Sequence, residues 1–161
     1  MSRDDHVGIA QMKVSTDPST VLTAPHLGSC LGVVIYDPIR KIGGVIHCLL
    51  PLSKSDPQKA KDKPCMYVDT GVVKLLEELI KLGASKKDLE ICVAGGAQIN
   101  DPENIFEIGK KNFTVLRKIL WKNNLLIKAQ DVGECHSRTI SLNIGTGEVW
   151  LKANGELKLL H

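Results

Sequence analysis

The sequence lacks the features that mark membrane-spanning and secreted proteins. No apolar run approaches the roughly 18 residues of a membrane-spanning helix, and the polar, charged start of the chain carries no apolar leader segment. The 5 cysteines are odd in number and include no C-x-x-C pair, which argues against a disulfide framework or a ribbon-type zinc site. These absences predict a cytoplasmic protein.

Aromatic residues and net charge are also scarce. Because only 4% of the residues are aromatic, the core must consist mainly of Leu, Ile and Val, and large surfaces for stacking bases are disfavoured. The formal net charge of +3 is too small to argue for a nucleic-acid partner.

The residues that are present predict one globular domain. A chain of 161 residues with 43% hydrophobic content suits a single domain, residues 1–161, with a sizeable core. Strands interrupted by two main helices predict an α+β fold, a layered αβ sandwich with mixed β-sheets. We expect helices from Thr70 to Leu82, capped by Asp69 and ended by Gly83, and from Gly109 to Lys122.

The other expected elements follow from apolar runs and turn residues. Residues 1–6 are expected to be a disordered lead-in, Pro51 to Pro64 a mobile loop, and Asn100 to Glu107 a loop excursion. Beyond the hairpin described next, strands are expected at Val7 to Val14, Val21 to Thr23, Glu90 to Ala94, Leu125 to Gln130, Arg138 to Asn143, Glu148 to Lys152 and Glu156 to Leu160, the last two joined by an Asn154-Gly155 turn.

The stretch from Leu27 to Leu50 predicts a β-hairpin with two chemically notable residues. A turn centred between Pro38 and Ile39 would place Cys30 directly opposite His47, so that a thiol and an imidazole meet on one face of the sheet. Pro38-Ile39 lacks the Gly or Asn chemistry of two-residue turns, so a bulge or a longer loop is the alternative.

This pairing suits a nucleophilic site. A free thiol with a pKa of about 8.5 is mostly protonated at neutral pH, and His47 as an imidazolium would lower that pKa. Gly28 allows a tight backbone path, Ser29 is small, and the backbone N–H groups around Ser29 and Cys30 could hold an oxyanion. Three alternatives stay open: a buried structural cysteine, His26 as the base in place of His47, and zinc held by residues among Cys30, His47, Cys48 and Cys65.

A set of ordered motifs resembles the CheD family of chemoreceptor glutamine deamidases. The matching segments are LGSC at 27–30, YDP at 36–38, GGVIH at 43–47, LP at 50–51, YVD at 67–69, AGGA at 94–97, IGKKN at 108–112 and DVGECHSR at 131–138. The ordered set is highly specific, although each motif alone would be weak.

The resemblance implies a cysteine-hydrolase-like fold and hydrolysis of glutamine side chains in the cytoplasmic helices of chemoreceptors, with no cofactor and no metal. It places the nucleophile on Cys30 and the histidine on His47. The family's third member, a threonine six residues before the cysteine, falls on Ala24, and Thr23 is the nearest threonine.

The resemblance also implies partners. A different reading is a non-catalytic adaptation protein that docks to the chemotaxis phosphatase CheC, and this could coexist with deamidation. Five basic residues gather between positions 110 and 122: Lys110, Lys111, Arg117, Lys118 and Lys122. Such a run usually forms the solvated face of a helix. The functional interpretation is that these residues attract acidic receptor helices.

Asp131, His136, Ser137 and Arg138 combine a carboxylate, an imidazole and a hydroxyl, as a second catalytic cluster would. We prefer a turn stabilised by a contact between Asp131 and Arg138.

Overall fold

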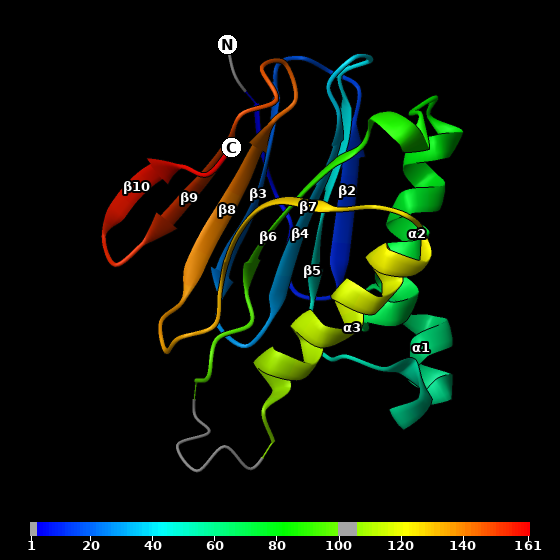
Figure 1. Ribbon diagram of the computed structural model, residues 1–161, viewed down its shortest axis with the longest axis vertical. Coiled ribbons are helices and arrows are strands. Elements are labelled where there is room, and N and C mark those ends of the chain that lie inside the picture. The colour runs from blue at the N-terminus through cyan, green and yellow to red at the C-terminus, as the bar shows by residue number, and fades with distance from the viewer. Residues whose placement is uncertain (1–2, 100–105) are drawn as a thin grey trace.

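The computed structural model describes residues 3–99 and 106–161, and it contains two mixed β-sheets and a layer of helices (Figure 1). Sheet A has the order β1 (Arg3–His6), β3 (Thr20–Leu27), β8 (Arg138–Asn143), β9 (Val149–Ala153) and β10 (Glu156–Leu159). Sheet B has the order β2 (Gln11–Ser15), β5 (Ile42–Cys48), β4 (Leu31–Asp37), β6 (Glu90–Gly95) and β7 (Ile127–Val132).

Each sheet combines parallel and antiparallel pairs. In sheet A only β1 and β3 run parallel among the described pairs, and in sheet B the parallel pair is β6 and β7. The helices α2 (Val68–Lys81) and α3 (Ile108–Lys122) cover the face of sheet B that is remote from sheet A (Figure 1). The predicted α+β sandwich with mixed sheets and two main helices is therefore confirmed.

Sheet B separates two apolar cores. One side of β4 and β5 packs against α2 and α3, with Leu31, Ile35 and Ile46 fully buried there. The other side packs against sheet A, with Cys30, Val34 and Val45 in the second core. Since side chains alternate along a strand, β4 and β5 are buried on both faces, which explains their nearly continuous apolar sequence.

The hairpin is confirmed, but its register differs from the prediction. Gly32 pairs with His47 and Tyr36 with Gly43, so four residues, 38–41, form the loop. The carboxylate of Asp37 fixes this longer loop, because its Oδ1 accepts hydrogen bonds from the backbone N–H groups of Ile39 (3.0 Å) and Arg40 (3.1 Å). Cys30 is consequently two residues away from the position opposite His47. A shift by two residues leaves both on the same face of the sheet.

Two segments expected to lack regular structure contain elements. Residues 3–6 form β1, which pairs with β3 and needs no apolar pattern, because main-chain hydrogen bonds such as Arg3 N to Ser19 O (2.7 Å) hold it. The expected mobile loop contains α1 (Pro57–Asp62), and its cap is Asp56, whose side chain accepts from the Lys59 N–H at 3.1 Å.

The two long helices agree closely with the prediction, apart from the cap of α2. Asp69 does not cap that helix; its carboxylate accepts hydrogen bonds from the backbone N–H (3.0 Å) and hydroxyl (2.8 Å) of Ser53 instead. Gly83 follows α2 with φ of 109°, as its role in ending the helix requires. Val73 and Ile80 are exposed on α2, whereas Leu75 is fully buried.

Strand β2 begins four residues later than expected, β3 is longer than expected, and β7 is displaced by two residues, while β6, β8, β9 and β10 lie within one residue of their predicted bounds. Most of the predicted excursion from Asn100 to Glu107 lies outside the described residues.

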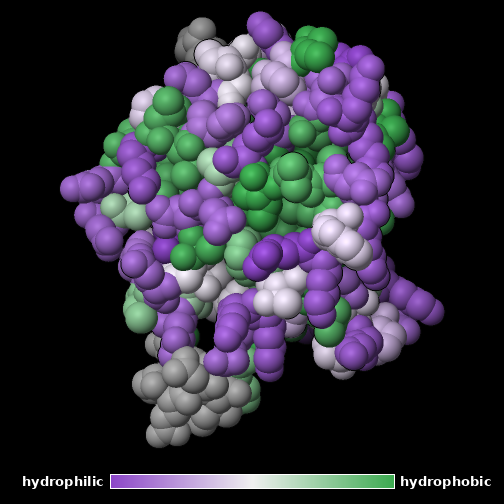
Figure 2. Space-filling model, viewed as in Figure 1, coloured by the Kyte–Doolittle hydropathy of each residue, from purple (hydrophilic) through white to green (hydrophobic). Residues whose placement is uncertain are grey.

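Within the described parts of the chain, no helix is both long and apolar enough to cross a membrane. Polar side chains dominate the face in Figure 2, with apolar residues gathered near its centre.

Candidate active site

Cys30 and His47 lie at the same end of sheet B and face sheet A. Cys30 directly precedes β4, and His47 is the penultimate residue of β5, next to that strand's end. Cys30 belongs to the core between the sheets, and His47 lies on the same face as Val45, two residues earlier in its strand. The two residues are diagonal neighbours, a relation that corresponds to roughly 7–8 Å between Cα atoms in a regular antiparallel pair.

One ring nitrogen of His47 is held and the other is open. His47 Nδ1 lies 3.1 Å from the carbonyl oxygen of Val7, which can only accept a hydrogen bond, so the proton of a neutral imidazole belongs on Nδ1. Nε2 is buried and has no hydrogen-bond partner among the residues that the structure describes. The lone pair of Nε2 is therefore available as a base.

Burial moves both groups toward their neutral forms. Burial has the largest effect on the pKa of the Cys30 thiol and raises it, although a hydrogen bond from the backbone N–H of Cys30 lowers it. Burial also dominates at His47 and lowers its pKa; the Val7 carbonyl raises that pKa and the nearby His26 lowers it. At neutral pH the structure thus favours a thiol beside a neutral imidazole, in contrast to the expected imidazolium.

The backbone around the thiol is fixed by three hydrogen bonds. The carbonyl oxygens of Gly28 and Cys30 accept from the N–H groups of Ala97 and Gly96, each at 2.9 Å. The carbonyl oxygen of Ser29 accepts from Nδ2 of Asn112, also at 2.9 Å. With its carbonyls held in this way, the segment 28–30 presents its N–H groups in defined directions.

The structure does not bring Thr23 to Cys30 and His47. Burial alternates along β3, with Leu22 and Ala24 in the core between the sheets and Thr23 on the other face of sheet A. There the hydroxyl of Thr23 lies 2.9 Å from the hydroxyl of Ser141 on β8. Ala24 does face the core that holds Cys30, but it has no polar side chain to offer.

The alternative base, the second polar cluster and the candidate zinc ligands do not form a site with Cys30 and His47. His26 is exposed, at a bulge of β3, whereas His47 is buried. The expected contact of Asp131 with Arg138 is confirmed, because Arg138 Nε lies 2.8 Å from Asp131 Oδ1. Cys48 and Cys65 belong to the core on the helix side, and no group of three or more His, Cys, Asp or Glu side chains within the described residues is placed to hold a metal ion.

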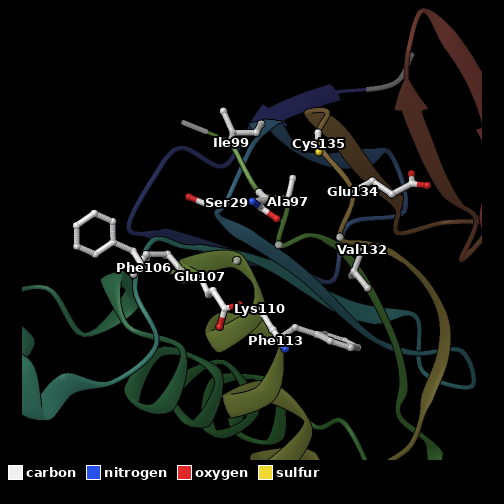
Figure 3. A pocket seen from close by; sticks show the side chains of 15 residues that line it. Ser29, Ala97, Ile99, Phe106, Glu107, Lys110, Phe113, Val132, Glu134 and Cys135 are labelled. Atoms are coloured by element: carbon white, nitrogen blue, oxygen red, sulfur yellow. The ribbon is translucent and has the colours of Figure 1, made fainter. Parts of the chain in front are cut away.

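A pocket of about 440 Å³ lies next to this site, and Ser29 forms part of its wall. Its lining comes from the start of α3, the loop after β6 and the loop after β7; in Figure 3, Ser29 and Ala97 lie between Cys135 on one side and Lys110 and Phe113 on the other. Cys30 and His47 do not line the pocket. These two residues are 6% and 2% exposed, respectively.

Two contributors were missed from the sequence. Val7 acts through its backbone carbonyl, for which a side-chain pattern carries no signal. Asn112 did leave a signal, because it stands four residues before Leu116 on the buried stripe of α3, where an apolar residue is the rule.

The family model and the curated relatives agree on one family. The family model for CheD, described as chemotactic sensory transduction, matches residues 49–153. A Solibacter usitatus protein named "Probable chemoreceptor glutamine deamidase CheD" is 46% identical over 154 residues, which cover 96% of this chain and 91% of the relative. Proteins of the same description from Syntrophus aciditrophicus and Pyrococcus horikoshii are 46% and 39% identical, covering 92% and 96% of this chain and 93% and 94% of the relatives.

Among solved structures, the crystal structure of a Neisseria meningitidis protein of family DUF152 is similar with a TM-score of 0.47 at 9% identity. The similarity covers 83% of this chain and 64% of that chain.

Proposed function

Since this chain belongs to the CheD family, we propose that it is a protein-glutamine deamidase that converts glutamine side chains of chemoreceptors to glutamate and ammonia, with Cys30 as nucleophile and His47 as base. The observation that carries the proposal is the state of His47. Its Nδ1 is held by the Val7 carbonyl, and its Nε2 is buried, unpaired within the described residues, and on the sheet face that Cys30 shares.

The first half of the reaction is acyl transfer to sulfur. As Cys30 Sγ attacks the carboxamide carbon, His47 Nε2 takes the thiol proton, and the amide oxygen becomes an oxyanion. The backbone N–H of Cys30 is the proposed donor to this oxygen, with Ser29 and Gly28 as supporting backbone. The imidazolium of His47 then gives its proton to the nitrogen, the C–N bond breaks, and ammonia leaves a thioester behind.

The second half consumes water. His47, neutral again, takes a proton from a water molecule as its oxygen attacks the thioester carbon. The C–S bond breaks, Cys30 recovers its proton from the imidazolium, and glutamate is released. Every proton in this cycle passes through Nε2, so the hydrogen bond of Nδ1 to Val7 can persist throughout.

Selectivity for glutamine must come from the surroundings of the pair, because a thiol and an imidazole serve other acyl transfers equally well. The pocket beside Ser29 supports this role, since its walls combine apolar side chains such as Phe113 and Val132 with polar groups. We propose that a receptor helix lies across this pocket and that its glutamine side chain passes Ser29 to reach the thiol. Because the substrate helices are cytoplasmic, the cytoplasm is the proposed site of action.

The test is direct. A chemoreceptor cytoplasmic fragment is incubated with the wild type, with Cys30→Ala and with Cys92→Ala, and glutamine-to-glutamate conversion is followed by peptide mass spectrometry together with ammonia release. Cys92 is a matched control because it is buried in the same core but is not part of the proposed site. We expect conversion with the wild type and Cys92→Ala and none with Cys30→Ala. Conversion that survives Cys30→Ala would remove Cys30 from the mechanism.

The alternative function, docking to the phosphatase CheC without catalysis, predicts a different result in this experiment. If the protein acts only as a binding partner of the phosphatase CheC, the receptor fragment stays unmodified while CheC binds the wild type and Cys30→Ala equally. We propose CheC as an additional partner, and measurement of its affinity for both proteins by calorimetry tests this separately from deamidation.

A further inference from the structure

Asn112 is a buried amide in a place where a helix normally presents an apolar side chain. It is 0% exposed and stands in the first half of α3, on the face toward sheet B. A polar side chain in such a place costs stability unless its hydrogen bonds are made. Both bonds of Nδ2 go to backbone carbonyls, Ser29 O at 2.9 Å and Leu49 O at 3.2 Å.

These two carbonyls flank the proposed reactive pair. Ser29 is bonded directly to Cys30, and Leu49 follows His47 by two residues. Asn112 Oδ1 is buried with no hydrogen-bond partner in the described part of the chain. The orientation of the amide is therefore set by the hydrogen bonds that Nδ2 donates to the Ser29 and Leu49 carbonyls. The contacts of this side chain are therefore directed at the backbone of the site.

The bond to Ser29 determines the direction of the next N–H. In a trans peptide unit the C=O of one residue and the N–H of the following residue point in opposite directions. Because the Ser29 carbonyl points to α3, the Cys30 N–H points away from α3. The bond between Cys30 O and Gly96 N at 2.9 Å restrains the peptide unit on the other side of the cysteine.

Because of the way strand β6 ends, the Cys30 N–H has no hydrogen-bond acceptor from that strand. A regular antiparallel pair would offer it the carbonyl of Gly96 in return for the Gly96 N–H. Gly95 and Gly96 have φ of 108° and 60°, and the Gly96 carbonyl lies against Gly109 of α3 instead. Within the described residues no acceptor is hydrogen-bonded to the Cys30 N–H, and its interaction with the thiol acts against the effect of burial on the Cys30 pKa.

We infer that Asn112 is a positioning residue, which holds the Ser29 carbonyl so that the Cys30 N–H is directed at the oxygen that becomes negative when the thiol attacks an acyl carbon. The inference rests on the proposed function for the identity of the substrate amide, but it concerns any acyl transfer to Cys30. Asn112 itself touches no reacting atom. Its main effect is on the oxyanion, and its effect on the nucleophilicity of the sulfur, which the same N–H influences through the pKa of the thiol, is smaller.

Two reagents separate these effects. Acylation of Cys30 by p-nitrophenyl acetate passes through an oxyanion, whereas alkylation by iodoacetamide does not. Both rates are measured at Cys30 by peptide mass spectrometry, in a Cys135→Ser background that removes the exposed cysteine. The variants are Asn112→Leu, which keeps the branching at Cγ and removes the donors, and Asn112→Ser, which keeps one donor and leaves room for water.

The matched control is Asn123→Leu, the same change at the other end of α3, where Nδ2 donates to Ile119 O at 2.8 Å. We expect Asn112→Leu to lower the acylation rate by about 10²-fold, the order of loss when an oxyanion donor is removed, with alkylation slowed by a much smaller factor. Asn112→Ser should fall between Asn112→Leu and wild type, and Asn123→Leu should match wild type. Thermal melting identifies variants that are folded; if Asn112→Leu is not, Asn112→Ser is the test.

The inference is overturned if acylation and alkylation fall by the same factor in a folded variant, if acylation does not fall, or if wild-type Cys30 is not acylated at all. Failure of the proposed function looks different. The receptor fragment would then stay unmodified by wild type, while the ratio of acylation to alkylation would still drop in Asn112→Leu.

Discussion

At the scale of single residues, burial favours the uncharged forms of both the proposed nucleophile, Cys30, and the proposed base, His47. The sequence predicted an imidazolium that lowers the pKa of the thiol, because a histidine beside a cysteine commonly has that effect. Burial, which a sequence does not show directly, acts in the other direction on both groups. In the proposed mechanism, the thiol therefore loses its proton to His47 during the attack and not before it.

This difference predicts the pH dependence of Cys30 reactivity. Because the pKa of the thiol is raised, alkylation of Cys30 by iodoacetamide should increase at higher pH than alkylation of N-acetylcysteine amide. Because the pKa of His47 is lowered, deamidation should be retained in mildly acidic solution and should be lost only as pH falls through that lowered value. A Cys30 that is already fully reactive toward iodoacetamide well below neutral pH would instead indicate a preformed thiolate and imidazolium pair.

Gly95 illustrates how tightly the backbone packs beside the thiol. It has φ of 108°, and an added Cβ would overlap the carbonyl oxygen of Cys30. We expect Gly95→Ala to lower the free energy of unfolding by about 2–4 kcal/mol, since strain in φ and a backbone clash act together.

Gly155 is the control for Gly95. It has φ of 77° but no atom within 4 Å of its added Cβ, so Gly155→Ala should cost only the conformational strain of about 1–2 kcal/mol. Urea unfolding of both variants measures the difference. Equal losses would show that the contact with Cys30 is relieved by a small shift of the backbone.

At the scale of elements, apolar periodicity and turn residues predicted most strands and both long helices. They failed where the decisive contacts are made by main-chain groups or by single polar side chains. Strand β1 is held by pairing with β3, and α1 begins at a proline behind the Asp56 cap. Neither requires an apolar pattern, so both segments resembled irregular chain.

The hairpin that carries Cys30 and His47 also shows where prediction from sequence patterns fails. The sequence placed Cys30 and His47 on one face, and this is confirmed because the error in loop length was two residues, which preserves alternation. The register itself depends on the Asp37 carboxylate, whose Oδ2 also accepts from the backbone N–H of Ser85 at 2.9 Å. Ser85 is 48 residues away in sequence, so local turn statistics could not include it.

Asp37→Asn tests the contribution of this carboxylate. Desolvation raises the pKa of Asp37, but hydrogen bonds from Ser85, Arg40 and Ile39 outweigh it, and the net pKa is lowered. The ionised side chain therefore stabilises the fold above the ordinary carboxyl pKa, and this stabilisation is lost as pH falls through the lowered folded value.

We expect Asp37→Asn to lower the free energy of unfolding by about 1–3 kcal/mol at neutral pH, with the gap to wild type closing in acid. Urea unfolding at several pH values measures the gap. Asp62→Asn, at an exposed position, is the control and should leave stability nearly unchanged. A gap for Asp37→Asn that does not change with pH would mean that shape, and not charge, is what the loop requires.

At the scale of the whole molecule, the proposed site lies where the two sheets come together at one end. Arg138 joins them there, because it belongs to β8 of sheet A and reaches residues at the ends of β6 and β7 in sheet B. Its Nε donates to Asp131 Oδ1 at 2.8 Å, and its Nη1 donates to the Gly133 carbonyl at 2.7 Å and more weakly to the Gly95 carbonyl at 3.4 Å. The side chain is fully buried, so these contacts are made away from water.

Asp131 offers an internal comparison, because it also pairs with an exposed cation. Lys158 Nζ lies 3.1 Å from Asp131 Oδ2, but the side chain of Lys158 is 59% exposed, whereas that of Arg138 is 0% exposed. An exposed pair is worth at most about 1 kcal/mol, so Lys158→Met should change stability little. Arg138→Met leaves Asp131 and three backbone carbonyls, those of Gly95, Gly133 and His136, without their buried donor, and we expect a loss of about 2–4 kcal/mol.

Urea unfolding of the two variants measures these losses, and the rate of Cys30 acylation reports on the site. Because the Gly95 carbonyl lies one residue before the Gly96 N–H that holds Cys30, we expect Arg138→Met to slow acylation as well as weaken the fold. If Arg138→Met and Lys158→Met cost the same, the two sheets are held together by their apolar core alone, and Arg138 only fills space between them.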